Sequence, residues 1–206
     1  LEQIADKVES KVDEIRSITN KYYSDVTLVG NTISSIDLEK TFTKDNIIIT
    51  LITILFIYII LYQTFKNKIL SLILILTIEG SILITFALSV IFNMKIFFMS
   101  YLVVSAIQMG ATIDYAIVFA SRYLENRCKY DKDKSINLTT KDRIGAILTS
   151  GLILTISGFI VGFVSTSSVI SSIGLFLGIG TLISLITTIF ILPTILYIFD
   201  KYIIYK

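Results

Sequence analysis

Five apolar runs, each long enough to cross a lipid bilayer, dominate this chain of 206 residues. A membrane-spanning helix needs about 17–25 mostly apolar residues, and such runs cover residues 47–65, 69–92, 96–121, 144–164 and 170–199. Within the hydrocarbon layer every backbone N–H and C=O group must be paired inside the protein, and a helix pairs them all within one segment. The sequence therefore predicts an all-α membrane protein with five transmembrane helices.

The composition agrees with this fold class and excludes several functions. Hydrophobic residues make up 54% of the chain, above the roughly 45–50% of soluble domains. The net charge of +2 is small and the basic residues flank apolar runs, so we expect no binding of nucleic acid. Histidine is absent and Cys128 is the single cysteine, so we expect no metal or cofactor. No catalytic cluster or nucleotide-binding loop is present, and we do not expect an enzyme.

The basic residues also predict the orientation in the membrane. The short loops on one side hold Lys66 and Lys68, then the basic residues of 122–143, then Lys201 and Lys206, whereas the other side holds only Lys95. Lysine and arginine favour the cytoplasmic side. We therefore expect a multi-pass protein of the cytoplasmic membrane, with residues 1–46 outside and the C-terminus inside.

Residues 1–46 predict a small extracytoplasmic region made of a helix, a short strand and a second helix. Apolar residues recur at helical spacing from Leu1 to Ile18, residues 26–29 resemble a strand ended by Gly30, and a helix begins near Thr32. A lone strand needs partners, and the chain opens on Leu1 rather than Met. We therefore expect an α/β remnant of a larger domain in a fragment of a longer protein; a free helical cap with a loop is the alternative.

Two local features concern the membrane domain, residues 47–206. The charged stretch 122–143 predicts a solvated connector with a short interfacial helix. Thr139 or Thr140 could cap the next helix, with Asp142 in its first turn. Pro193, the single proline, lacks a backbone donor and predicts a kink in the last span.

Asp114 is the first candidate functional residue. It lies in the run 96–121, about 10 Å inside the apolar layer at a helical rise of about 1.5 Å per residue. A charge inside the membrane costs about 2.5–3.5 kcal/mol on the most lenient scale, and desolvation favours the neutral form. An acid that can take up and release a proton suits a proton relay, with Tyr115 about 100° around the helix. A neutral aspartic acid that only holds helices together is the alternative.

Glu79 is the second candidate for the relay. It lies about 15 Å deep in the run 69–92, a depth comparable with that of Asp114 on the next span. The two acids could share a proton. The alternative is a protonated glutamic acid that donates a hydrogen bond between helices.

Small residues four positions apart predict close helix packing. Gly158 and Gly162 form one Gly-x-x-x-Gly pair, Gly174 and Gly178 form another, and Gly110 follows Ala106 at the same spacing. Such pairs let helix backbones approach one another in membranes. We interpret these glycines as packing residues, not as relay groups.

Taken together, these segments resemble the MMPL branch (mycobacterial membrane protein large) of the resistance-nodulation-division superfamily. Residues 108–115 read Gln-Met-Gly-Ala-Thr-Ile-Asp-Tyr and residues 121–125 read Ser-Arg-Tyr-Leu-Glu, similar to the signature helix of that branch. Segments 149–158 and 174–193 look like the two following helices, and residues 65–67, Phe-Lys-Asn, stand where the family has Phe-Arg-Ser. Some members carry an arginine where this chain has Thr188.

The resemblance implies a transporter of two similar halves, of which this chain is the end of the second porter domain plus five helices. It implies that Asp114 and Tyr115 meet the equivalent pair of the other half and relay protons. The expected function is proton-driven export of lipids or other hydrophobic molecules, with protons, cargo, the missing half and membrane lipids as partners. A sterol- or lipid-sensing membrane domain and a protein-export accessory subunit of the same superfamily are the alternatives.

Overall fold

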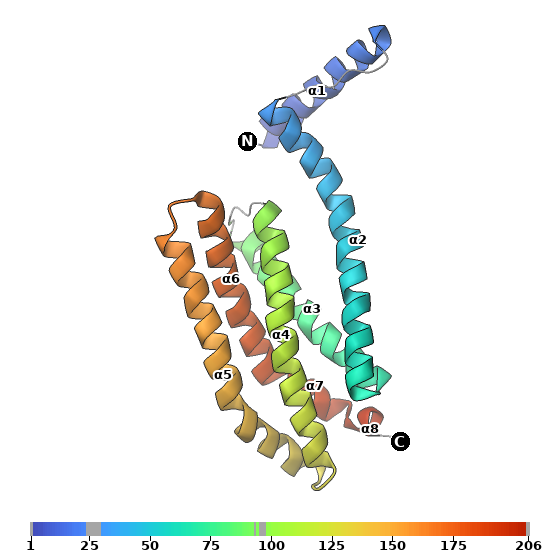
Figure 1. The fold of residues 1–206 in the computed structure, drawn as a ribbon, viewed down its shortest axis with the longest axis vertical. Helices are drawn as coiled ribbons and strands as arrows, with labels where there is room; N and C mark the ends of the chain where they lie inside the picture. Colours follow the sequence, from blue (N-terminus) through green and yellow to red (C-terminus); the bar gives the residue numbers. More distant parts are fainter. Residues whose placement is uncertain (1, 24–29, 93, 95–97, 205–206) are drawn as a thin grey trace. The chain divides into compact units, whose positions relative to one another are not determined.

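The computed structural model describes residues 2–23, 30–92, 94 and 98–204, and it is helical almost throughout (Figure 1). The helices are α1 (Glu2–Tyr22), α2 (Asn31–Phe65), α3 (Lys68–Ile91), α4 (Phe98–Arg127), α5 (Lys132–Val164), α6 (Ser168–Ile186), α7 (Leu192–Ile198) and α8 (Asp200–Ile203). A π-helical segment, Thr187–Ile191, joins α6 to α7. The predicted strand 26–29 lies outside the described residues.

Among the described residues, five helices are long and apolar enough to cross a membrane: Asp45–Phe65, Lys68–Ile91, Ser100–Arg127, Lys132–Val164 and Ser168–Ile198. The prediction of an all-α protein with five transmembrane helices is therefore confirmed. The chain divides into two compact units, Leu1–Leu51 and Ile52–Lys206. In the first unit, α1 is an amphipathic helix whose Val12 is buried and whose Ile15 and Ile18 are exposed.

In the second unit α6 lies against α3, α4 and α5, and α4 also contacts α3 and α5 (Figure 1). The main core lies toward the end that carries α7 and α8. It includes the fully buried Leu74 of α3, Tyr123 of α4 and Leu192 and Leu196 of the last span. The outward faces of the helices remain apolar and exposed, as at Leu76 and Ile160, which is expected of helices surrounded by lipid.

The turn between α2 and α3 is set by two residues. Lys66 takes a φ of 51°, the left-handed conformation that ends many helices. The side chain of Asn67 then accepts hydrogen bonds from the amide groups of Ile69 at 3.0 Å and Leu70 at 3.1 Å, which caps α3. Its amide nitrogen also donates to the carbonyl of Ile203 at 2.6 Å, and this bond ties α8 to the same turn.

The connector between α4 and α5 is shorter than expected. Helix α5 begins at Lys132 with Asp131 as its N-cap residue, so the predicted helix start at Thr139 or Thr140 is wrong. Thr139 lies inside α5, where its hydroxyl donates to the carbonyl of Ser135 at 2.8 Å and accepts from the amide of Asn126 at 2.9 Å. No glycine or proline interrupts this stretch, so the helix continues out of the apolar layer.

The last span contains a local change of helix type before Pro193. The amide of Leu192 donates to the carbonyl of Thr187, five residues earlier, which is the pattern of a π-helix. Pro193 itself provides no amide donor. Such segments often occur at functional sites, and Thr188 within it has a buried hydroxyl with no hydrogen-bond partner among the described residues.

Glycines bring α5 and α6 into backbone contact. A Cβ atom added at Gly158 would lie 2.6 Å from the backbone nitrogen of Gly178, and one at Gly162 would lie 2.8 Å from that of Leu175. One at Gly174 would meet the backbone of Gly162. The four glycines of the two Gly-x-x-x-Gly pairs therefore lie at one interface.

Gly110 on α4 behaves differently from these four residues. Within the described part of the chain, no heavy atom lies within 4 Å of a Cβ atom added there. The close contact expected at Gly110 is therefore not formed by these five helices.

Candidate functional site

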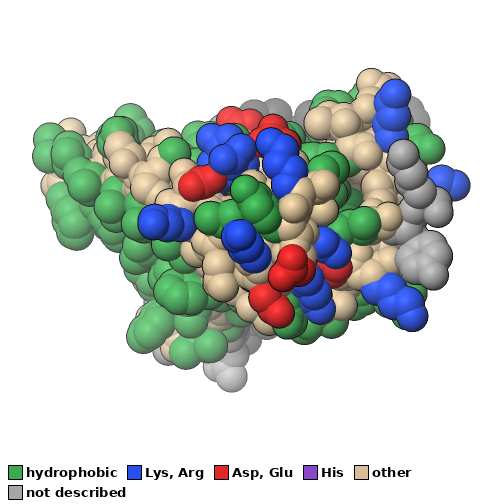
Figure 2. All heavy atoms as spheres, turned by 90° about the horizontal axis from the view of Figure 1, so that it is seen from below, with side chains coloured by type: hydrophobic (Ala, Val, Ile, Leu, Met, Phe, Trp, Pro, Cys, Tyr) green, Lys and Arg blue, Asp and Glu red, His purple; other side chains and the backbone are tan. Residues whose placement is uncertain are grey.

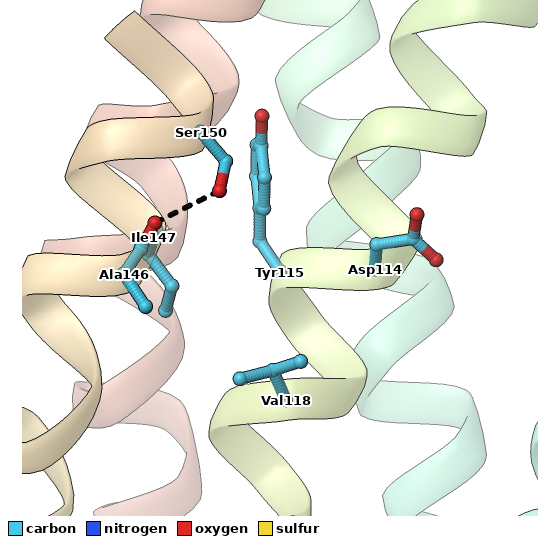
Figure 3. A pocket seen from close by; sticks show the side chains of 6 residues that line it. All are labelled: Asp114, Tyr115, Val118, Ala146, Ile147 and Ser150. Carbon is cyan, nitrogen blue, oxygen red and sulfur yellow. Dashed lines mark hydrogen bonds between the residues drawn. The ribbon is translucent and has the colours of Figure 1, made fainter.

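The Asp114–Tyr115 pair lies on α4, beside a cavity of about 200 Å³ between α4 and α5. Asp114, Tyr115 and Val118 of α4 line it, together with Ala146, Ile147 and Ser150 of α5. The Tyr115 ring extends along the α5 side of the cavity, and the Asp114 carboxyl group points away from α5 (Figure 3). Successive residues on a helix differ by about 100°, so the two side chains lie in different surroundings.

The side chains of Asp114 and Tyr115 differ in how exposed they are. The side chain of Tyr115 is 8% exposed and packs in the main core, whereas Asp114 is exposed. Asp114 has no hydrogen-bond or ion-pair partner among the residues that the structure describes. Ionisable residues at membrane depth usually mark functional sites. The exposed position of Asp114 therefore favours a functional role over a structural one.

Ser150 provides the other polar side chain of this cavity. Its hydroxyl donates to the backbone carbonyl of Ala146 at 2.9 Å (Figure 3). Serines in membrane helices often bond their own backbone in this way. The hydroxyl proton of Ser150 is thus already engaged within α5.

Glu79 lies on α3 and is half-buried. Its neighbours Ile78 and Ile82 pack against Met109 of α4, but no hydrogen bond or ion pair joins Glu79 to Asp114 in the described part of the chain. The structure does not bring the two predicted relay acids together by a direct bond.

A buried polar cluster, which the sequence did not reveal, joins α3, α4 and α6. The side-chain amide of Gln108 donates to Thr85 at 3.0 Å and to Ser184 at 3.1 Å, and Thr112 lies 2.8 Å from Ser184. Ser81 completes the cluster, with its hydroxyl 3.1 Å from that of Ser184. Gln108 and Thr112 precede Asp114 on α4, so the cluster fixes the rotation of the helix that carries the candidate relay pair.

A second unpredicted cluster holds the end of α4 to α8. The Tyr123 hydroxyl donates to Asp200 at 2.5 Å, and Arg127 makes a bidentate pair with both oxygens of the same carboxylate at 2.9 Å. Burial alone would raise the pKa of Asp200, but the hydrogen bonds from Arg127 and Tyr123, with the charges of Arg127 and Lys132, lower it below its ordinary value. The carboxylate therefore stays ionised and paired.

Charged side chains gather at this end of the second unit, where Figure 2 shows basic and acidic groups interspersed. Arg122 pairs with Asp142 at 2.6 Å and with Glu125 at 2.9 Å, and all three side chains are at least one-third exposed. Lys132 lies 3.7 Å from the centre of the Tyr197 ring. Among the described residues no group of three or more histidine, cysteine, aspartate or glutamate side chains could hold a metal ion.

Five apolar helices, one of which carries Asp114 within its apolar run, define a multi-pass membrane protein. The family model described as the MMPL family matches residues 2–202. The chain therefore belongs to the MMPL family, and the resemblance seen in its motifs is confirmed.

A relative supports this assignment. The chain is 22% identical over 183 residues to ActII-3 of Streptomyces coelicolor, whose name describes it as a membrane protein. The alignment covers 86% of this chain and 26% of that relative. The chain thus spans about a quarter of the relative's length.

Proposed function

We propose that this chain is part of a larger transporter that exports lipids or other hydrophobic molecules across the cytoplasmic membrane and is driven by the proton gradient. Asp114 is the proton carrier, and Tyr115, about 100° around α4 from it, is the second group of the relay. Membership of the MMPL family, in the resistance-nodulation-division superfamily, supports a membrane transporter. The main support at the level of residues is Asp114, which has no partner among the described residues and is exposed on α4 next to a tyrosine buried in the core.

The exposed carboxyl group also supports the proposed partner. Facing hydrocarbon, a charge would cost about 2.5–3.5 kcal/mol or more, so in the complete protein we expect a polar surface to cover this side of α4. The other half of the transporter supplies that surface. Protonation of Asp114 then removes the charge and changes the attraction between the two halves, which couples proton transfer to movement.

The proposed orientation puts the α4–α5 turn in the cytoplasm. Cys128 is an exposed free thiol in this turn, so it can report the orientation directly. With any other cysteines of the full-length protein replaced by serine, a membrane-impermeant maleimide should label Cys128 in inverted membrane vesicles and leave it unlabelled in intact cells. Labelling in intact cells would show that the orientation is the opposite of the one proposed.

The decisive experiment measures transport by the full-length protein in liposomes under an imposed proton gradient. A trapped pH-sensitive dye follows protons, and a fluorescent phospholipid serves as the trial cargo. We expect Asp114→Asn to reduce both fluxes to background, since asparagine cannot take up a proton. Tyr115→Phe should lower them roughly fivefold, the equivalent of a lost hydrogen bond of about 1 kcal/mol.

Asp131→Asn is the matched control, because it makes the same chemical change at an exposed position in the turn before α5. We expect this variant to transport at the wild-type rate. Undiminished flux in Asp114→Asn would contradict the proposal. If lipid binding persisted in that variant and wild-type protein moved no protons, the lipid-sensing alternative would take its place.

A further inference from the structure

One side-chain amide inside the bundle joins three helices. Gln108 of α4 is fully buried, and its Nε2 atom donates to the Thr85 hydroxyl of α3 at 3.0 Å and to the Ser184 hydroxyl of α6 at 3.1 Å. A glutamine amide nitrogen carries two hydrogens, so both are used and each reaches a different helix. Gln108 therefore ties α4 to α3 and to α6 at the same time.

The hydroxyl groups around Gln108 determine which way its amide faces. The proton of Thr85 is donated to the Ser81 carbonyl at 2.8 Å. The Ser81 hydroxyl donates to the Ile78 carbonyl at 2.7 Å, so it can accept the proton of Ser184, 3.1 Å away. With their own protons used in this way, Thr85 and Ser184 offer acceptor oxygens to the amide. The nitrogen of Gln108 must therefore face them, and its oxygen, Oε1, must point elsewhere.

Gly180 of α6 makes room for that oxygen. A Cβ atom added at Gly180 would lie 2.5 Å from Oε1 and 3.0 Å from Cδ of Gln108, so a larger residue would displace the amide. Oε1 is buried and has no hydrogen-bond partner among the described residues. An unpaired buried carbonyl oxygen is unfavourable, and here this cost is offset by the two bonds that the nitrogen makes in the same orientation. The pairing of Gln108 with Gly180 thus fixes one arrangement of the amide.

A further contact extends this attachment along α4 toward the relay pair. The Thr112 hydroxyl lies 2.6 Å from the Gln108 carbonyl and 2.8 Å from Ser184, two residues before Asp114. Helix α4 is continuous through this region, so a rotation at Gln108 carries over to Asp114. A turn of about 20° would move a group about 6 Å from the helix axis by roughly 2 Å. A misplacement of about 1 Å can slow a reaction about a hundredfold.

We propose that Gln108, with its amide against Gly180, is a positioning residue for the proton relay of Asp114 and Tyr115. It holds α4 at the rotation at which Tyr115 packs in the main core and Asp114 faces outward. Gln108 itself neither takes up nor passes on a proton. The inference rests on the proposed function, because it gives Gln108 and Gly180 a part in the same relay.

The first test measures proton flux of the full-length protein in the liposome assay. Gln108→Met keeps the length of the side chain and removes the amide, whereas Gly180→Ala keeps Gln108 and displaces its amide. We expect each variant to lower the flux per folded protein about tenfold. The matched controls are Gln63→Met, at an exposed position of α2, and Gly145→Ala, where no described atom lies within 4 Å of the added Cβ atom. Both controls should transport at the wild-type rate.

The second test separates positioning from a general loss of structure. Dicyclohexylcarbodiimide reacts with protonated carboxyl groups inside membranes, so its adduct on Asp114, measured by mass spectrometry at a series of pH values, reports the surroundings of this acid without any transport. Glu79 of α3 has the other carboxyl group within the apolar runs, and trypsin cleavage at Lys95 separates the two peptides.

Amide and hydroxyl side chains do not titrate in the range of this assay, so removing them alters the labelling of Asp114 only through its surroundings. We expect the pH of half-maximal labelling to shift by about half a unit or more in Gln108→Met and in Gly180→Ala. The two control variants should keep the wild-type value.

Wild-type flux in Gln108→Met or in Gly180→Ala would overturn the proposal. It would also be overturned if flux fell only in proportion to the amount of folded protein, measured by thermal unfolding in detergent, while the labelling of Asp114 kept its wild-type pH dependence. Gln108 would then support the fold and nothing more.

The Asp114→Asn variant separates this inference from the proposed function. If Asp114→Asn transports normally, the relay is wrong, but a shifted labelling of Asp114 in Gln108→Met still shows that Gln108 positions this acid. If Asp114→Asn abolishes flux while Gln108→Met and Gly180→Ala transport normally, the relay stands and the positioning role is wrong.

Discussion

The two faces of α5 meet their neighbours in opposite ways. Toward α6, Cβ atoms added at Gly158 and Gly162 would lie within 2.8 Å of the α6 backbone. Toward α4, the contact leaves a cavity of about 200 Å³ beside Tyr115. The first face brings the backbones of α5 and α6 into contact, and the second leaves room for a neighbouring group to move or to change its protonation.

This difference shows how a membrane helix can be fixed on one side and free on another. Lipid chains are as apolar as the helix surfaces, so helices associate through close packing and hydrogen bonds rather than through the hydrophobic effect. Glycines provide the packing between α5 and α6. Helix α4 is held instead by hydrogen bonds, through Gln108 to α3 and α6 and through Arg127 to α8. Toward α5 it is held near its end by Asn126, which donates to Thr139, and that side is open at the level of Tyr115.

The largest expected effect comes from adding one methyl group to the close face. Gly158→Ala places a Cβ atom 2.6 Å from the backbone nitrogen of Gly178. Because backbone cannot rotate away, the helices must separate, and we expect a loss of about 3 kcal/mol, toward the upper end of typical overpacking costs. Thermal unfolding in detergent measures the change.

Gly110→Ala is the matched control, since no described atom lies within 4 Å of its added Cβ atom. There the better helix propensity of alanine should stabilise the protein by about 0.5–1 kcal/mol. Equal effects of the two substitutions would show that the glycines of α5 do not mediate close packing. A large loss at Gly110 in the full-length protein would instead indicate that another part of that protein packs against it.

The next effect tests whether α4 is held at its end by α8. Asp200→Asn removes the charge-assisted bonds to Arg127 and should cost about 2 kcal/mol. Glu125→Gln, at the exposed pair with Arg122, should cost less than about 1 kcal/mol. If the two losses were equal, the Asp200 cluster would not be a special anchor of α4.

The Asp200 cluster also predicts how stability depends on pH. The pKa of Asp200 in the folded protein is lower than its ordinary value. Its contribution to the free energy of unfolding is therefore complete at pH values above the unfolded pKa of about 3.9. It is lost as the pH falls through the folded pKa, because the protonated acid no longer pairs with Arg127. Thermal unfolding measured against pH should show this acid loss in wild-type protein and a smaller one in Asp200→Asn.

A smaller effect is expected within the polar cluster of α3, α4 and α6. Ser184→Ala removes one partner of Gln108 and one of Thr112, but Gln108 keeps its bond to Thr85 and Thr112 keeps its bond to the Gln108 carbonyl. Hydrogen bonds between membrane helices contribute about 0.6 kcal/mol on average, and we expect a loss of that size. A loss above about 2 kcal/mol would mean that the cluster acts as a unit.

The transmembrane helices could be predicted from sequence because hydropathy is a property of each side chain by itself and does not depend on which other helices it contacts. The predicted run 69–92 and the observed Lys68–Ile91 nearly coincide. The run 144–164 failed to predict that α5 begins at Lys132, since a helix without glycine or proline continues into water although its hydropathy falls. The strand predicted at residues 26–29 falls outside the described residues.

The candidate site could be predicted only in part. Asp114 stands out because a single acid in an apolar run is costly. The partners of Gln108 and Asp200 lie 76 and 73 residues away in the chain, and no pattern within one helix can indicate such pairings. The opposite surroundings of Asp114 and Tyr115 likewise depend on which neighbours α4 meets, although the angle between them followed from helix geometry.

The smallest expected effect concerns Ser150, on the open face of α5. Its hydroxyl is exposed and donates to the Ala146 carbonyl, so Ser150→Ala should change the free energy of unfolding by less than about 0.5 kcal/mol. Because that proton is engaged within the helix, we also expect wild-type proton flux in the liposome assay, in contrast with Tyr115→Phe. A loss of flux at unchanged stability would mean that Ser150 turns toward Tyr115 during transport, and the open face of α5 would then be part of the relay rather than only the space beside it.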